Sequence, residues 1–169
     1  MTKKAALFID GSNLFSSAKS VNFDLDYKKL LDYFKRDFED NFLRAYYYTA
    51  VRTETTEKDP IRPLLDWLDY NGYTMVTKPV KEFVTDAGVK RRKGNMDIEM
   101  AVDALELAEH LDHAIFFTGD GDFRYAIEAI QRKGVRVVVV STPELIADEL
   151  RRQADHIIYL AELEDEIAK

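Results

Sequence analysis

Short apolar runs alternate with segments of helical periodicity along most of the chain. The run over 4–9 ends at Asp10 and is typical of a strand buried on both faces. The segment 27–38 instead spaces its leucines and phenylalanines as one face of a helix does. This alternation predicts strands at 4–9, 43–51, 73–83, 114–118, 136–140 and 156–160. It predicts helices at 27–38, 95–111, 122–133 and 143–153, a further helix between Pro60 and Asn71, and an exposed hairpin or loop at 84–93.

Strands that alternate with helices pair in parallel through right-handed crossovers, so helices cover both faces of the sheet. We therefore predict an α/β fold, a three-layer sandwich. Ligands of such sheets bind beyond the carboxyl ends of the strands, near the point where the strand order reverses. The residues that follow the predicted strands are therefore the first candidates for function.

The length of 169 residues predicts one domain, 1–169, and the 46% hydrophobic and 33% charged residues are typical of a compact globular protein. A net charge of −7 argues against coating nucleic acid by bulk charge, although it allows a local basic patch. The lack of cysteine excludes disulfides, thiolate zinc sites and cysteine nucleophiles. No apolar run approaches the roughly 18 residues of a membrane span, so we expect a soluble, cytoplasmic protein with no membrane partner.

Acidic residues follow two of the predicted strands. Asp10 ends the first, and Asp120 and Asp122 follow the fourth within a Gly-Asp-Gly-Asp turn. If the two strands are neighbours, these carboxylates converge at one edge of the sheet. Asp97 lies in the first turn of the helix that leads into the fourth strand. That helix runs antiparallel to the strands, so its start faces the same crevice.

Carboxylates gathered in a small cavity repel one another, by about 4 kcal/mol for a pair 4 Å apart at an effective dielectric constant near 20. A cation is needed to neutralise them. None of the three histidines, His110, His113 and His156, stands at these strand ends. Ligation by oxygen alone suits Mg²⁺ or Mn²⁺ and fits zinc poorly. Because such ions take further ligands from phosphate, the implied substrate is a phosphate ester.

Each of these aspartates alone also has a structural interpretation, since an acid between a strand and a helix is commonly an N-cap or a turn former. Asp10 is followed by two alternative caps, Ser12 and Asn13. Asn13 is therefore either the cap or a helper that holds Asp10, a water or a phosphate oxygen. Thr118 could orient Asp120 through its hydroxyl, although a β-branched residue at a strand end needs no such role.

Further acids lie on the helix that begins near Asp97. Asp103 is six residues further along, which places it about 240° around the helix and favours a structural role over metal ligation. Glu99 and Glu106 are expected to be solvated.

Four consecutive basic residues stand just before Asp97: Lys90, Arg91, Arg92 and Lys93. Such a run is typical of a solvated loop. Its position beside the predicted acidic cluster also fits a clamp for a nucleic-acid backbone, because a substrate with many phosphates needs cations around a repulsive mouth. Both interpretations stay open at the level of sequence.

Five segments in this order and spacing are together specific, although each alone is weak. They are LFIDGSNL at 7–14, KGNMDIEMAVDAL at 93–105, FFTGDGDF at 116–123, the strand at 134–141 and LRRQADHII at 150–158. They resemble the NYN domain family, in the LabA-like branch of the PIN-like nucleases. The resemblance implies a Rossmann-like sheet in strand order 3-2-1-4-5, an acidic Mg²⁺ or Mn²⁺ site and cleavage of RNA. The matching positions are Asp10 with its helper Asn13, Asp97 and Asp103 on the central helix, and the pair Asp120 and Asp122.

The function that we predict is that of a metal-dependent ribonuclease acting on RNA, expected to be single-stranded, with 3′-hydroxyl and 5′-phosphate products as the family resemblance implies. One alternative is a regulatory module that binds RNA or a nucleotide without cutting it. A less favoured alternative is a Mg²⁺-dependent phosphatase that uses Asp10 as its nucleophile, since Asp10 lacks a second acid two residues on. A homodimer is left open.

Overall fold

A computed structural model, which describes residues 3–51, 60–93 and 95–169, contains a parallel sheet of six strands in the order β3-β2-β1-β6-β7-β8. The strands are β1 (Ala5–Asp10), β2 (Phe42–Val51), β3 (Thr74–Pro79), β6 (His113–Phe117), β7 (Arg136–Ser141) and β8 (His156–Tyr159). The predicted order of five strands is thereby confirmed, with the sixth strand added at one edge.

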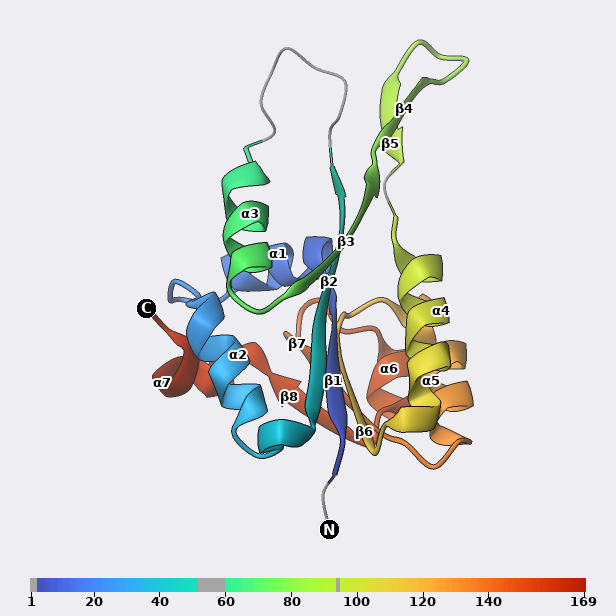
Figure 1. Ribbon diagram of the computed structural model, residues 1–169. Coiled ribbons are helices and arrows are strands. Elements are labelled where there is room, and N and C mark those ends of the chain that lie inside the picture. Colours follow the sequence, from blue (N-terminus) through green and yellow to red (C-terminus); the bar gives the residue numbers. More distant parts are fainter. Residues whose placement is uncertain (1–2, 52–59, 94) are drawn as a thin grey trace.

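Helices cover both faces of the sheet, which confirms the three-layer sandwich (Figure 1). One layer holds α1 (Gly11–Ser20), α2 (Tyr27–Lys35), α3 (Arg62–Tyr70) and α7 (Glu164–Ile167). The other holds α4 (Asp97–Leu107), α5 (Arg124–Gln131) and α6 (Asp148–Gln153). Four 3-10 turns complete these layers: η1 (Glu39–Asn41), η2 (Ala108–His110), η3 (Gly121–Phe123) and η4 (Leu160–Leu163). Within the described ranges, no helix has both the length and the apolar character to cross a bilayer.

Strand β1 lies at the centre of the sheet and is buried on both faces. Leu7 and Ile9 pack into the core beneath α2 and α3, whereas Ala6 and Phe8 pack into the core beneath α4 and α5. This two-sided burial is why the strand is an apolar run rather than an alternating one.

The structure differs from the sequence prediction in several elements. Helix α6 begins at Asp148, whereas the prediction began it at 143, and α7 was not predicted. The strand predicted at 73–83 ends at Pro79, which is paired with Val51, the last residue of β2. After it, β4 (Lys81–Val84) and β5 (Lys90–Lys93) form an antiparallel hairpin that extends beyond the carboxyl edge of the sheet (Figure 1). Helix α1 was not predicted, because its buried face includes Gly11 and Ser17 and so lacks a clear apolar period.

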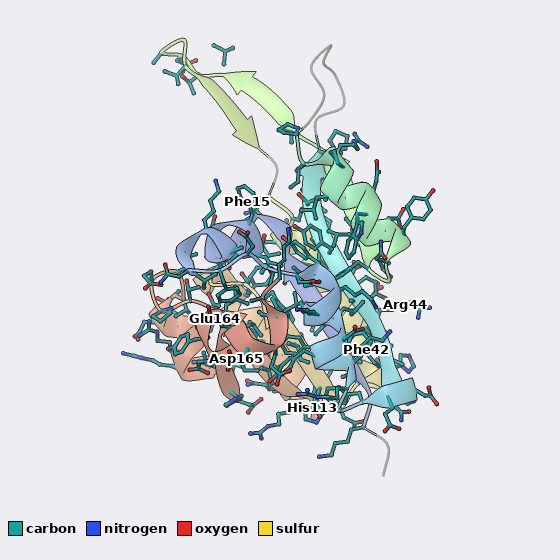
Figure 2. The ribbon with its side chains drawn as sticks, turned by 90° about the vertical axis from the view of Figure 1, so that its left-hand side faces the viewer. Phe15, Phe42, Arg44, His113, Glu164 and Asp165 are labelled. Atoms are coloured by element: carbon teal, nitrogen blue, oxygen red, sulfur yellow. The ribbon has the colours of Figure 1, made fainter. Side chains whose placement is uncertain are left out.

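The strand order reverses between β1 and β6, where Ile9 is paired with Phe117. After these residues the chain leaves β1 for α1 and leaves β6 for η3 and α5, which lie in opposite layers. Figure 2 shows Phe42 and His113, which begin β2 and β6, lower in the view than Phe15 on α1. The crevice at the carboxyl edge is therefore formed by the residues that follow β1 and β6.

Candidate metal centre

Three carboxylates gather at this crevice. Asp97, Asp120 and Asp122 each offer one oxygen, and these three oxygens all lie within 4.8 Å of one another. Asp97 is the first residue of α4, and the other two belong to the turn between β6 and α5. Two segments that are separate in the sequence thus supply a donor set made only of oxygen, which is the set that Mg²⁺ and Mn²⁺ prefer.

Backbone hydrogen bonds hold the turn that carries Asp120 and Asp122. A carboxylate oxygen of Asp120 accepts from the N–H of Asp122 at 2.9 Å, and the Thr118 hydroxyl accepts from the N–H of Asp120 at 3.2 Å. Thr118 therefore fixes the backbone of Asp120, whereas the sequence had suggested a bond to its carboxylate. Gly119 is required here, because a Cβ atom would collide with the carbonyl oxygen of Leu145.

Asn95 orients Asp97, a role that the sequence analysis missed. The Asn95 amide donates to a carboxylate oxygen of Asp97 at 3.0 Å, and its carbonyl oxygen accepts from the Asp97 N–H at 2.6 Å. The hydrogen bond from the Asn95 amide favours the charged form of Asp97. Burial and the neighbouring Asp120 and Asp10 carboxylates outweigh it and raise the Asp97 pKa to about 6. A bound cation would relieve this repulsion.

Asp10 lies beside the three-carboxylate cluster without belonging to it. Its carboxylate accepts from the N–H of Asn13 at 3.3 Å and caps α1, so the structural interpretation of Asp10 is realised. It also lines a cavity of about 390 Å³ together with Asp97 and Asp120. Burial, followed by the charge of Asp120, raises the Asp10 pKa. Asp10 is therefore both a cap and a wall of the crevice.

The remaining predicted residues near β1 and α4 have separate contacts. Ser12 lines the same cavity as Asp10. The side-chain oxygen of Asn13 lies 3.5 Å from the Ser17 hydroxyl. Asp103 accepts a hydrogen bond of 3.0 Å from the buried Tyr48 hydroxyl, and it lies outside the three-carboxylate cluster. Asp103 thereby ties α4 to β2, in agreement with the structural role favoured by its angular position.

The sequence predicts a solvated Glu99, but in the structure Glu99 forms an ion pair. Its carboxylate lies 2.9 Å from the ammonium nitrogen of Lys78 on β3, and each side chain is only about one-third exposed. Lys78 also lines a second cavity, of about 810 Å³, which shares Asp97 with the first cavity and includes Asp122. The acidic cluster therefore lies where the two cavities meet.

The four basic residues Lys90, Arg91, Arg92 and Lys93 form β5, the strand of the hairpin that precedes α4. The expected hairpin is thus present at this position. The side chains of these residues lie outside the described part of the structure, so their contact with nucleic acid stays a prediction.

The fold and this acidic cluster correspond to a known class of protein. The chain belongs to the NYN domain family, whose family model matches residues 4–162 and whose members are generally nucleases. Across 168 residues it is 35% identical to the Low amplitude and bright protein LabA of Synechococcus elongatus, an alignment that covers 98% of this chain and 88% of that protein.

Two further proteins are similar to this chain. The uncharacterized protein MJ0482 of Methanocaldococcus jannaschii is 35% identical over 71 residues, which are 41% of this chain and 30% of that protein. The crystal structure of VPA0982 from Vibrio parahaemolyticus, a protein of unknown function, matches with a TM-score of 0.76 and 25% identity over 98% of this chain and 96% of that one. The predicted family and fold are therefore confirmed.

Proposed function

We propose that this protein is a metal-dependent ribonuclease that hydrolyses phosphodiester bonds of single-stranded RNA. The observation that carries the proposal is the cluster of Asp97, Asp120 and Asp122, whose oxygens lie within 4.8 Å of one another at the strand-order reversal. Membership of a family of nucleases supports it. A cluster of this charge needs a cation, and a divalent cation held by carboxylates is suited to a phosphate ester.

Asp97, Asp120 and Asp122 would hold Mg²⁺ or Mn²⁺. Such an ion supplies Lewis acidity, which makes water a better nucleophile and stabilises negative charge on the phosphoryl oxygens. Asn95 would keep the Asp97 carboxylate turned toward the cluster through the two hydrogen bonds that they share. The rigid turn at Gly119 would keep Asp120 and Asp122 at a fixed separation from Asp97.

Asp10 would take the proton of the attacking water. It lines the cavity beside the cluster but is not one of its three members, and burial raises its pKa. A carboxylate with a raised pKa is a better proton acceptor than an ordinary one. Its bond to the Asn13 N–H and its position at the start of α1 hold it in place for this role.

The test is incubation of single-stranded RNA with the protein and Mn²⁺, with and without EDTA. We expect strand scission that EDTA abolishes and that Asp97→Asn removes. Asp148→Asn is the matched control, because Asp148 also begins a helix, α6, but its carboxylate pairs with Arg152 and is not one of the three in the cluster. Scission that persists in EDTA, or an equal loss in both variants, would contradict the proposal. Binding of RNA without scission would favour the non-catalytic regulatory module.

A further inference from the structure

We propose that Lys78 binds the RNA phosphate next to the one that is cut, with the attached nucleoside in the larger cavity. This inference rests on the proposed function, since it assigns the neighbouring part of the same substrate. The larger cavity has a volume of about 810 Å³, within the range of roughly 300–1,000 Å³ that is usual for small-molecule sites. It adjoins the acidic cluster through Asp97 and Asp122.

The charge at this cavity is unevenly distributed. Of the described residues that line it, Lys78 is the cation, and Asp97, Glu99 and Asp122 are the acids. An RNA strand that places one phosphate at the acidic cluster must run its next phosphates past the walls of the crevice. A phosphate beside the acids alone would be repelled, so the strand is expected to follow the cation.

The backbone explains why Lys78 faces this cavity. Side chains alternate along β3, and Lys78 lies on the same face as Val76, which packs into the core beneath α4. Glu99, in the first turn of α4 and two residues beyond Asp97, then holds the ammonium nitrogen at 2.9 Å. Because each side chain of this ion pair is about one-third exposed, the pair contributes little to stability. Its larger effect is to keep Lys78 at the wall of the larger cavity.

Apolar groups on the other walls suit a nucleoside. Ile98 lines the cavity and is 77% exposed, although it lies directly after Asp97 in the first turn of α4. Pro79 and the buried Phe123 line the same space. A base or ribose against these residues would cover apolar surface that otherwise contacts water. The cavity thus combines one cation with apolar walls, as a nucleotide requires.

The competing interpretation is that Lys78 and Glu99 form a purely structural ion pair between β3 and α4. Three variants separate the two: Lys78→Met, Glu99→Gln and Lys133→Met. Lys133 is the matched control, because it is a similarly exposed lysine that pairs with a glutamate of another element, Glu109, at 3.7 Å. Binding of a short fluorescein-labelled single-stranded RNA is measured by anisotropy in EDTA, where the proposed reaction cannot proceed, at salt concentrations from about 50 to 200 mM.

We expect Lys78→Met to weaken binding and to reduce the slope of log K against log salt by about 0.7, the value for one phosphate contact on a single strand. Glu99→Gln should bind as well as the wild type or better, Lys133→Met should match the wild type, and Lys78→Arg should restore the slope. An unchanged slope in Lys78→Met overturns the inference. So does an equal loss in Lys78→Met and Glu99→Gln, or a wild type that does not bind RNA.

Scission of the same RNA with Mn²⁺ separates this inference from the proposed function. If the wild type cuts RNA and Lys78→Met alters neither the slope nor KM, the inference alone fails. If the wild type binds with the Lys78-dependent slope but does not cut, the ribonuclease proposal alone fails. For an active enzyme we expect Lys78→Met to raise KM with little change in kcat, because the contact lies beside the reacting phosphate.

Discussion

Two turns at the carboxyl edge of the sheet, after β1 and after β6, contain the same Asp-Gly pair. In the first, Asp10 caps the ten-residue helix α1 through the Asn13 N–H. In the second, Asp120 caps only the three-residue turn η3, and Asp122 adds another carboxylate. The role of an aspartate at a strand end is therefore set by the element that it caps and by the acids around it. Asp10 caps α1 and also lines the cavity, whereas Asp120 and Asp122 are two of the three carboxylates of the cluster.

The largest expected effect is a loss of RNA scission when a carboxylate of the turn after β6 is removed. We expect Asp120→Asn to reduce RNA scission by about 100-fold or more, because the cluster would lose one of its three anionic ligands. Initial rates with Mn²⁺ measure this effect. A variant that retains more than about a tenth of the wild-type rate would contradict the role assigned to Asp120.

Metal-induced stability should separate the two turns. Mn²⁺ at a hundredfold excess over Kd is expected to stabilise the wild type by about 2.7 kcal/mol. Asp120→Asn should lose this gain, whereas Asp10→Asn should keep most of it, because Asp10 lies outside the cluster. Thermal melts with EDTA or Mn²⁺ measure the difference. An equal loss in the two variants would make Asp10 a fourth ligand.

Without metal, substitutions in the turn after β1 should lower stability more than substitutions in the turn after β6. In EDTA we expect Asp10→Ala to lower the free energy of unfolding by about 0.5–2 kcal/mol, because the cap of α1 is lost. Asp10→Asn should recover much of it, since asparagine also caps. Asp120→Asn should be as stable as the wild type or more stable, because the removal of one charge relieves repulsion. Urea titration measures all three, and a clear loss in Asp120→Asn would contradict the repulsion argument.

The smallest expected effect is a pH dependence that arises from Asp97. Folding raises its pKa from 3.8 to about 6, so its contribution to the stability of the metal-free protein is fully present below about pH 4 and is lost as pH rises through 6. Asp97→Asn should therefore gain stability relative to the wild type between these pH values, by less than about 1 kcal/mol because the carboxyl is partly solvated and screened. Urea titrations in EDTA at several pH values measure this gain. A relative loss of stability would contradict the sign.

Saturating Mn²⁺ should reverse this pH dependence in the wild type. Protons compete with the ion for the carboxylates, so metal-induced stabilisation should increase as pH rises through about 6. Thermal melts of the wild type with Mn²⁺ or EDTA at several pH values measure this increase, and the same melts of Asp97→Asn are the control. A metal-induced gain independent of pH across this range would show that Asp97 does not take part in binding.

Much of the fold could be predicted because its signals are local. The apolar run before Asp10 and the intensely apolar β7 are buried by helices on both sides, and that burial is what their composition indicates. The convergence of Asp97, Asp120 and Asp122 follows from the direction of the elements, because the helix that precedes β6 begins at the edge of the sheet where β6 ends. Such features need only periodicity and the handedness of crossovers.

Other parts of the site depend on contacts between segments that no local pattern connects. Lys78 and Glu99 belong to β3 and α4, and Tyr48 and Asp103 to β2 and α4, so their pairing requires the three-dimensional arrangement. The role of Asn95 has a local signal in the sequence, namely its position two residues before Asp97. An asparagine two residues before a helical aspartate can hydrogen-bond that residue's N–H, as it does here.

The pairing of Ile9 with Phe117 has a consequence for the order of events during folding. The site combines residues 10, 97 and 120, so it exists only after the two ends of a long chain segment have come together. Contacts so distant in sequence close slowly, because the entropy of the intervening loop must be lost first. The three-carboxylate cluster stands at the edge of the sheet where β6, the neighbour of β1, ends. An ion that needs this folded edge cannot guide the early collapse. The ion should instead act mainly by slowing the unfolding of the folded protein. The concentration of metal would then control the lifetime of the native state and not the rate of folding.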